Sequence, residues 1–573
     1  MPDALPDLES RRSEIVKQLA RLGDLRSGSI SNTSGRCGKP NCHCHQPDQP
    51  VHGPNSRLTY KEQGKTITES LPTPAAQKKA EREIAEFRRF EQLVREFIEV
   101  NAKICRVRPM EQGQPLSQEK KTTAAACEKA VSTLEHQFQR IFADRHRTGH
   151  LDLEAVEMAI RSTVHQTGAD AVSELLRFDP PDTDHRSLPC DCGHAAQYVG
   201  MRSRPLLTAV GWARIDRPYY LCSECSQGQF PADVQLGIDK TDYSPGVRRM
   251  LAAVGSEMPF VPGRQQLKLL ADLEVTAKAI ERTAESIGAD IEVRQQQDIR
   301  KAKQLCLPAM AGSRIPHLYV QMDGTQVFVV KSETEGRAGR TPGQPARTRE
   351  CKLGCVFTQT GVDDQGRSVR DEGSTTYVGA IETAEDFGLR IYTEAYHRGW
   401  DRATIRVVIG DGSHWIWNLA DRHFPGAIQI VDLYHACEHL WDLARKLHPG
   451  DEVAQKRWLR YKLDWLEKGK IEKLVAALRM TADSITNPEF AKTIGIEAEY
   501  FDSNRDRMRY PEFRQQNLFV GSGVIEAGCK TVIGSRLKQS GMFWTVRGAN
   551  AIIALRCCCM SGKFESYWEE RAS

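Results

Sequence analysis

The sequence predicts a multidomain α/β protein in which zinc modules precede a catalytic domain that is interrupted by an all-helical insertion. Two observations favour this class. Closely spaced cysteines occur twice in the first half of the chain, and from about residue 312 short apolar runs alternate with amphipathic helical patterns. At about 150 residues per domain, a chain of 573 residues has room for several domains. We expect the regions 1–105, 106–185, 186–240, 241–311 and 312–573, with the insertion at about 450–515.

The composition limits the class of protein. A net charge of +4 is only mildly basic, so composition alone does not establish a nucleic-acid partner. The first twenty residues lack the apolar core of a secretory signal, and no apolar run reaches the roughly 18 residues of a membrane span. We therefore expect a soluble cytoplasmic protein. In that compartment, seventeen cysteines favour metal sites and buried thiols, such as the CCC run at 557–559, over a disulfide framework.

The N-terminal region combines a polar, turn-rich segment with a long amphipathic helix. A Cx4CxC…H spacing fits a Cys₃His zinc site formed by Cys37, Cys42, Cys44 and His52. His43 and His45 are competing candidates for the fourth ligand. From about 75 to 106, apolar residues recur at helical spacing, so the helix must bury its stripe on its own domain or on a second copy. The stretch 106–121 is a linker by composition, and helical patterns resume over about 122–177.

Residues 186–240 carry a second cysteine module. A CxC pair and a CxxC pair, about thirty residues apart, predict a zinc ribbon with the ligands Cys190, Cys192, Cys222 and Cys225. The first pair is one residue shorter than the usual CxxC, so His194 is an alternative ligand. Residues 241–311 read as short helices broken by Pro and Gly. That layout fits a helix-turn-helix-like DNA-binding unit with the helix after Val275 as the reader, and it also fits any three-helix packing unit.

The region from residue 312 onwards predicts a ribonuclease H-like sheet. Strand-like runs occur at HLYVQMD, KLGCVFTQT, TTYVGAI, IRVVIGD and AIQIVD. Three strands in succession, followed by strands that alternate with helices, give the ribonuclease H-like order. The helical patterns at 450–515 fall between the last strand and a C-terminal helix.

Three carboxylates in this region stand where a two-metal DNA-cutting enzyme needs them. Asp323 and Asp411 end apolar strand runs, and Glu526 opens the C-terminal helix in an apolar, glycine-rich setting. We expect Glu526 to point into packed structure, where a carboxylate needs a partner. Converging carboxylates can hold two divalent cations about 3.5–4 Å apart, and oxygen ligands suit Mg²⁺ or Mn²⁺. Taken singly, each Asp could begin a turn or cap a helix, and Glu526 could pair with Lys530 on the helix surface.

Asp432 and His435 stand three residues apart at a strand-to-helix junction. Asp432 can cap the helix, and His435 can bond to Asp432 or to a substrate phosphate. The plain alternative is a cap with packed histidines, including His439.

Basic residues gather in two places that could contact DNA. A Gly/Arg-rich loop between the first two strands contains Arg337, Arg340, Arg347 and Arg349. The second group follows Glu526, lies near Phe543 and Trp544, and consists of Lys530, Arg536, Lys538 and Arg547. Basic groups bind phosphates and aromatic rings stack on unpaired bases. A solvated basic face above core aromatic residues would give the second pattern as well.

From Cys190 to the C-terminal helix, the sequence resembles the Kra-type bacterial insertion-sequence transposases, relatives of the Mutator-like transposases. The blocks that carry the resemblance are YYLCSECSQGQFPADVQLGI, VQMDGTQ, VIGDGSHWIWNL, VDLYHACEHL and GSGVIEAGCKTVIGSRLKQSGMFWTVRGANAI. The resemblance implies a ribonuclease H-like DDE core with Asp323, Asp411 and Glu526 as the metal-binding triad. It also implies that Asp432 and His435 are the additional D-x-x-H pair of that group. The first 105 residues resemble a small cysteine-rich domain often found in mobile-element proteins.

These observations predict a DDE transposase of a bacterial, nucleoid-associated mobile element. We expect it to bind the double-stranded ends of an insertion sequence and to catalyse Mg²⁺- or Mn²⁺-dependent cleavage and strand transfer. Zinc would be structural, and holding two DNA ends together calls for a homo-oligomer. Two alternatives remain open, namely a domesticated DNA-binding protein with residual acids and a metal-dependent nuclease without strand transfer.

Overall fold

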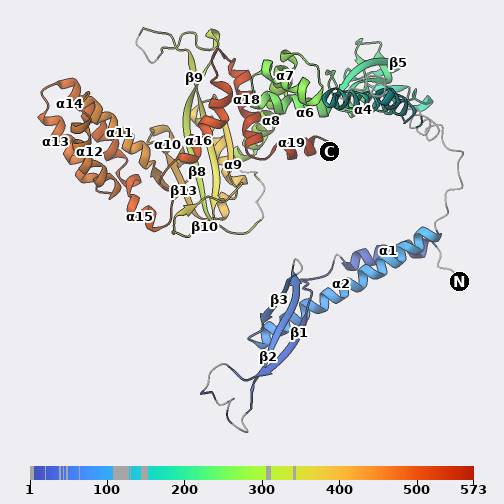
Figure 1. The fold of residues 1–573 in the computed structure, drawn as a ribbon, viewed down its shortest axis with the longest axis horizontal. Helices are drawn as coiled ribbons and strands as arrows, with labels where there is room; N and C mark the ends of the chain where they lie inside the picture. Colours follow the sequence, from blue (N-terminus) through green and yellow to red (C-terminus); the bar gives the residue numbers. More distant parts are fainter. Residues whose placement is uncertain are drawn as a thin grey trace. The chain divides into compact units, whose positions relative to one another are not determined.

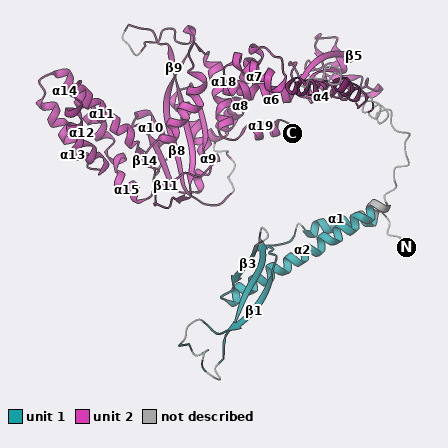
Figure 2. Cartoon of the chain, in the orientation of Figure 1, with its two compact units in different colours: residues 1–125 teal, residues 126–573 magenta. Residues whose placement is uncertain are grey.

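The computed structural model describes residues 5–19, 21–37, 41–42, 44, 46, 50–62, 65–107, 128, 131–143, 152–304, 307, 312–339 and 343–572. The predicted linker from 108 onwards, as well as Arg340, His43 and His45, therefore lies outside the described residues. The chain divides into two compact units, Met1–Ala125 and Ala126–Ser573, which are described separately (Figure 2). Within the described residues, no helix combines the length and apolar character that crossing a membrane requires.

Unit 1 pairs a helical hairpin with a small sheet. Helix α1 (Leu5–Leu19) packs against the long helix α2 (Pro74–Val107). The antiparallel sheet has the order β1-β2-β3, with bounds Ser29–Gly35, His52–Glu62 and Lys65–Ser70. Leu58 of β2 packs with Ala80 and Ile84 of α2 in a small core, so the sheet covers part of the apolar stripe of α2.

The first half of unit 2 contains a second small sheet and a set of helices. After helical residues 131–143 and helix α4 (Leu153–Leu175), a four-stranded antiparallel sheet has the order β4-β5-β6-β7. Its strands are Ser187–Pro189, Ala195–Thr208, Gly211–Cys222 and Gly228–Gln229. Four helices follow, namely α5 (Pro231–Gln235), α6 (Pro245–Glu257), α7 (Phe260–Ala271) and α8 (Ala277–Lys303).

The second half of unit 2 is built on a five-stranded mixed sheet with the order β12-β9-β8-β13-β14 (Figure 1). Strand β9 is antiparallel to β8 and β12, whereas β13 runs parallel to β8 and β14 runs parallel to β13. The strands are β8 (Ile315–Phe328), β9 (Thr348–Gln359), β12 (Thr376–Ala380), β13 (Ala403–Gly410) and β14 (Ile428–Val431). A two-stranded hairpin, β10 (Gly361–Val362) and β11 (Ser368–Val369), follows β9.

Helices cover both faces of this sheet. On one face Gly354 of β9 lies against Phe387 and Ile391 of α9 (Ala384–His397), and on the other Gly379 of β12 lies near Ile553 of α18 (Val546–Met560). Further helices of this half, outside the segment between α11 and α16, are α10 (His414–His423), α11 (Leu433–Leu447), α16 (Gly523–Gly528), the π-helical turn η6 (Cys529–Gly534), α17 (Ser535–Leu537) and α19 (Phe564–Ala572).

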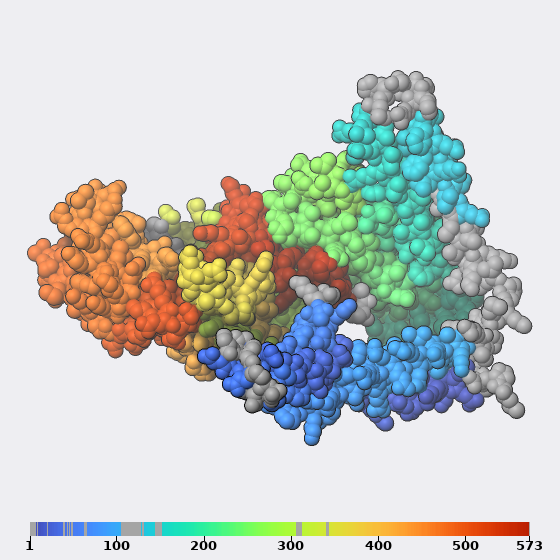
Figure 3. Space-filling view, turned by 60° about the horizontal axis from the view of Figure 1, so that its bottom comes forward, coloured from blue at the N-terminus to red at the C-terminus, as the bar shows by residue number. Residues whose placement is uncertain are grey.

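Between α11 and α16 the described chain is helical, and in Figure 3 this segment, coloured orange, forms one continuous lobe. Its elements are α12 (Glu452–Glu467), α13 (Ile471–Ser484), α14 (Pro488–Ser503), the short η5 (Arg505–Met508) and α15 (Tyr510–Gln515). Buried leucines such as Leu459, Leu466 and Leu474 join these helices to the main core.

Helices α6–α8 are packed onto the sheet domain rather than held apart from it. Helix α8 buries Ala284, Ile287 and Ile291 in the main core, against α18. The Arg390 guanidinium of α9 donates to Glu292 of α8 at 2.7 Å. The buried face of α8 is therefore occupied by protein. The helix after Val275 is α8, and its DNA-reading role stays a prediction that only its outward-facing residues could fulfil.

Candidate functional site

Asp323 on β8 and Asp411, which directly follows the neighbouring strand β13, lie at the same level of the sheet. In the parallel pairing of β8 with β13, Ile409 is the partner of Gln321, so Asp411 follows β13 at the level of Asp323. Neighbouring strands are about 4.8 Å apart, which brings two carboxylates from distant parts of the sequence to one place.

The prediction that the first strand ends at Asp323 is wrong. Strand β8 continues five residues further, and its ladder with β9 extends from the pair Asp323 and Leu353 to the pair Phe328 and Thr348. The pairing with β9 runs through Gly324, Thr325 and Gln326 without a shift of register, so β9 holds this polar stretch in the strand. Asp323 thus projects from the middle of a long strand, whereas Asp411 directly follows the last residue of β13.

The surroundings of Asp323 disfavour its charged form. Burial raises the pKa of Asp323, and the negative charge of Asp411 raises it further. Three groups act in the opposite direction: the Cys529 thiol at 3.3 Å and the Gly324 N–H at 2.7 Å donate to its carboxylate, and the charge of His435 favours the ionised form. Asp411 in turn accepts from the Ser413 N–H at 2.8 Å and from the Ser413 hydroxyl at 3.0 Å. All four donors are neutral, so a divalent cation could neutralise the charge of the two carboxylates.

Glu526 does not point into packed structure as predicted, because its side chain is exposed. It lies in the first turn of α16, and its carboxylate accepts a hydrogen bond from the Ser522 hydroxyl at 3.1 Å. The glycine-rich residues before it leave this side of the helix open, while Ile525 takes the buried position. Among the described residues, Asp323, Asp411 and Glu526 do not form a tight group of ligand atoms of the kind seen in the two cysteine clusters.

Asp432 directly follows β14, beside the end of β13, and is fully buried. One carboxylate oxygen accepts from the His435 N–H at 2.8 Å and caps α11, and the other accepts from the Ser522 N–H. Both oxygens therefore bind backbone, which favours the capping interpretation over direct contact with a substrate. The His435 side chain is 38% exposed and forms an ion pair with Glu438 at 3.5 Å.

The helical lobe contributes a residue that the sequence reasoning missed. The Tyr500 hydroxyl of α14 donates to the backbone carbonyl of Asp411 at 3.0 Å. Its ring stacks on His439 with 4.0 Å between centroids, and His439 forms a 2.7 Å pair with Glu497. No pattern around Tyr500 pointed to this position, since the two residues are 89 positions apart in the sequence. His439 therefore supports Tyr500, which in turn supports the loop that carries Asp411.

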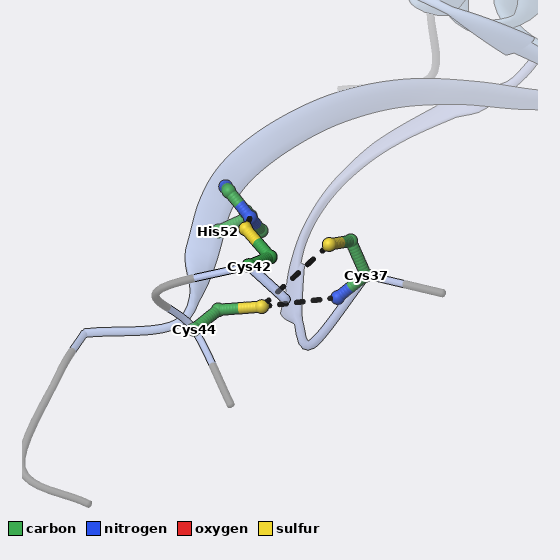
Figure 4. A group of neighbouring side chains, drawn as sticks. All are labelled: Cys37, Cys42, Cys44 and His52. Atoms are coloured by element: carbon green, nitrogen blue, oxygen red, sulfur yellow. Dashed lines mark hydrogen bonds between the residues drawn. The ribbon is translucent and has the colours of Figure 1, made fainter. Parts of the chain in front are cut away.

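The first cysteine cluster gathers Cys37, Cys42, Cys44 and His52, whose ligand atoms all lie within 4.8 Å of one another (Figure 4). The Cys42 Sγ is 2.9 Å from the His52 Nε2, and the Cys44 Sγ is 3.7 Å from the Cys37 Sγ. His52 begins β2, so the sheet of unit 1 holds one side of this cluster. Three thiols and an imidazole at this spacing could hold a structural zinc ion.

The second cluster gathers Cys190, Cys192, Cys222 and Cys225 within the same 4.8 Å limit. The Sγ atoms of Cys190 and Cys225 are 3.5 Å apart, and those of Cys192 and Cys222 are 3.6 Å apart. The Cys225 N–H lowers the pKa of the Cys222 thiol to about 7, whereas the neighbouring thiols Cys190 and Cys192 raise the pKa of Cys225 to about 12. The cluster could hold a structural zinc ion through four sulfurs. His194 lies beside it, with its Nδ1 3.6 Å from the Cys192 Sγ.

Arg536 is not available to DNA, contrary to the prediction. Its side chain is fully buried, donates to the Gly255 carbonyl at 2.9 Å and lies over the rings of Phe260 and Trp544 at 4.5 and 5.1 Å. Burial lowers the pKa of Arg536 to about 10, helped by the nearby Arg556 charge. Arg536 joins α17 to the end of α6, and Trp544 is a core residue at 7% exposure.

The other predicted basic residues are mostly at the surface. Lys538 donates to the Thr325 hydroxyl, two residues beyond Asp323 on β8, and so lies beside the aspartates. Arg349 is partly buried and donates to the Glu333 carbonyl at 3.3 Å. The other described members of the two groups are exposed, namely Lys530, Arg547, Arg337 and Arg347.

The fold and these sites define a mixed α/β multidomain protein with two thiol clusters that could hold zinc. Residues 5–113 match the family model described as a domain of unknown function, DUF6788. The chain is 23% identical over 359 residues to the "UPF0236 protein in vanSb 3'region" of Streptococcus gallolyticus, which covers 61% of this chain and 71% of that protein. A search of solved structures matches the "Drosophila P element transposase strand transfer complex" at 8% identity over 60% of this chain and 84% of that chain. Its TM-score of 0.22 is too low to support an inference.

Proposed function

We propose that this protein is a DDE transposase with a ribonuclease H-like core and that Asp323, Asp411 and Glu526 are its catalytic acids. The observation that carries the proposal is the register of β8 and β13, which brings Asp323 and Asp411 to the same level on neighbouring strands. The strand order and directions of the five-stranded sheet support the ribonuclease H-like core, because three antiparallel strands are followed by two parallel ones. Glu526 is carried by a helix whose backbone is bonded to β8.

The donor set suits Mg²⁺ or Mn²⁺, since Asp323, Asp411 and Glu526 offer carboxylate oxygens. Such ions, when bound by these carboxylates, supply Lewis-acid stabilisation of the attacking and leaving oxygens of a phosphodiester. His435 is partly exposed and within electrostatic reach of Asp323, so it can donate to a DNA phosphate. Lys538 can bind the next phosphate, because it lies beside Thr325.

The remaining parts of the chain would hold and orient DNA. We assign one structural zinc ion to each cysteine cluster. The zinc ribbon and the outward residues of α6–α8 would contact the ends of the element. The accessible arginines of the loop between β8 and β9 would bind phosphates of double-stranded DNA. Cleavage at two ends calls for a homo-oligomer on DNA in the bacterial cytoplasm.

The proposal is tested with Asp323→Asn, Asp411→Asn and Glu526→Gln in cleavage and strand-transfer assays on the element's own ends with Mg²⁺. Each substitution should abolish cleavage and leave DNA binding largely intact. The control is Asp364→Asn, which changes an exposed carboxylate in the β10–β11 turn and should cut at the wild-type rate. Near wild-type cleavage by a triad variant would remove that residue from the site. Cleavage without strand transfer in the wild type would favour a plain nuclease, and DNA binding without cleavage would favour a domesticated DNA-binding protein.

A further inference from the structure

Gln321 is a polar side chain in the middle of a buried strand. Its neighbours on β8, among them Leu318, Val320 and Met322, are buried and apolar, and Gln321 itself has 0% exposure. A buried amide without hydrogen bonds costs free energy, so a Gln at such a position indicates that its groups have specific partners.

Both ends of the Gln321 amide bind the backbone of the segment that leads into α16. The Nε2 group donates to the Gly521 carbonyl at 3.2 Å, and the Oε1 atom accepts from the Ile525 N–H at 3.0 Å. These partners are 200 and 204 residues away in the sequence. One side chain of β8 therefore fixes the two ends of the segment 521–525, directly before Glu526.

The Ile525 N–H belongs to the first turn of α16, where backbone donors have no partner within the helix. Ser522 is the N-cap residue of α16, and in the described chain its side chain makes no capping bond to the helix backbone. Gln321, which lies on strand β8, supplies the missing acceptor. The helix start that carries Glu526 is thus oriented by β8 rather than by its own sequence.

A second anchor holds the same segment from the other side. The Ser522 N–H donates to the Asp432 carboxylate, and the Leu433 N–H donates to the Val520 carbonyl at 2.9 Å. Asp432 directly follows β14, whose last residue, Val431, pairs with Gly410 of β13. The two anchors therefore connect the segment to β8 on one side and to the end of β14 on the other, with Asp411 between them.

We propose that Gln321 is a positioning residue that sets the place of Glu526 relative to Asp323. Gln321 precedes Asp323 by two residues, so both side chains project from the same face of β8. The strand whose Gln321 side chain fixes the first turn of α16 is therefore also the strand that carries Asp323. This inference rests on the proposed metal-binding triad, and it adds a residue that touches neither metal nor DNA.

The test replaces Gln321 with Met, which keeps the volume and removes both strong hydrogen bonds. The matched control is Gln359→Met. Gln359 is also buried, at 1% exposure, and its amide donates to the Gly361 and Asn517 carbonyls and accepts from the Tyr319 hydroxyl. Both variants lose comparable bonds, so both should lower the unfolding midpoint. Only the Gln321 variant should loosen the start of α16.

Two readouts separate positioning from general stability. Hydrogen exchange of full-length protein should show faster exchange in the peptide that spans residues 521–527 for Gln321→Met alone. Titration with Mn²⁺ followed by electron paramagnetic resonance should show affinity weakened about tenfold or more in that variant, as for other residues that orient metal ligands. Its cleavage rate should recover as Mn²⁺ is raised, whereas Asp323→Asn should not recover.

The outcomes also separate this inference from the proposed function. A wild-type protein that binds no Mn²⁺ and cuts no DNA would overturn the triad, and the positioning role with it. A competent wild type beside a Gln321→Met variant with normal exchange and normal Mn²⁺ affinity would overturn the positioning role alone. Equal loosening of residues 521–527 by the Gln359 variant would also overturn it, because the effect would then be general destabilisation.

Discussion

Gly288 is the point at which helix α8 meets α18, and a single methyl group there should separate the two helices. A Cβ atom on Gly288 would lie 1.9 Å from the Ala551 carbonyl oxygen and 2.5 Å from its carbonyl carbon. The obstacle is backbone, which cannot rotate away as a flexible side chain can. The helices would have to move apart by roughly 1 Å before the separation reached even 3.0 Å, in a core packed at crystal-like density.

The magnitude follows from two opposing effects of Gly288→Ala. Alanine is favoured over glycine in a helix interior by about 1 kcal/mol. Overpacking of a well-packed core costs about 1–3 kcal/mol, and a backbone obstacle puts this site at the upper end of that range. We therefore expect a net loss of about 1–2 kcal/mol in the free energy of unfolding of unit 2.

Gly495→Ala is the matched control, because Gly495 lies in α14 and a Cβ atom added to it would meet nothing within 4 Å. The same substitution there should stabilise the protein by up to about 1 kcal/mol. The two variants are compared by urea unfolding of the full chain, followed by tryptophan fluorescence. If Gly288→Ala unfolds at the wild-type midpoint or above it, the close approach of α8 and α18 is wrong, and with it the packing of α6–α8 on the sheet.

Four further predictions concern the metal sites and DNA. Purified protein never exposed to chelator should contain two zinc ions per chain by mass spectrometry, and Cys222→Ser and Cys42→Ser should each lose one, so finding none would refute both sites. As the pH is lowered, Mn²⁺ affinity should begin to fall above about pH 3.9, the usual pKa of an Asp, because the raised pKa of Asp323 lets this ligand take up its proton at a higher pH. An affinity that stays constant as the pH is lowered to about 3.9 would contradict the assignment. Arg536→Gln should lower stability without changing the salt dependence of DNA binding, since Arg536 is buried. The loop arginines are Arg337, Arg340, Arg347 and Arg349. Neutralising them should instead flatten the log–log salt slope by roughly 0.9 for each phosphate that the variant no longer binds, and an unchanged slope would show that none of them binds a DNA phosphate.

Local patterns in the sequence are enough to predict several features that depend on neighbouring residues. The run before Asp411 is β-branched and apolar, and the structure contains a strand that ends one residue before it. The cysteine spacings predict two groups of ligands, and the same four residues lie together in each group. Short-range spacing is informative here because CxC and CxxC pairs on a turn bring thiols close whatever the rest of the chain does.

Other features could not be predicted, because they depend on what packs on a residue from far away. The charge pattern around Arg536 is the same whether the side chain is buried or exposed, and its burial depends on Gly255 and Phe260, which lie more than 270 positions away in the sequence. The apolar neighbours of Glu526 predict an inward side chain, yet on a helix successive residues face different directions, and Ile525 occupies the buried one. The apolar run before Asp323 predicts a strand that ends there, but pairing with β9 carries the strand through Gly324.

The residues that support the acids share a property that explains why sequence reasoning finds the acids first. Gln321, Asp432 and Tyr500 bind backbone groups that are 204, 90 and 89 residues away, respectively. Each acid has a local signal, since a strand or helix start stands beside it, whereas each supporting residue acquires its role only when the fold is complete. A buried amide or carboxylate in an otherwise apolar run is nevertheless visible in the sequence, and Gln321 and Asp432 both have that mark. Because burying such a group without partners is costly, its presence in a strand predicts a long-range tether even before the partner is known.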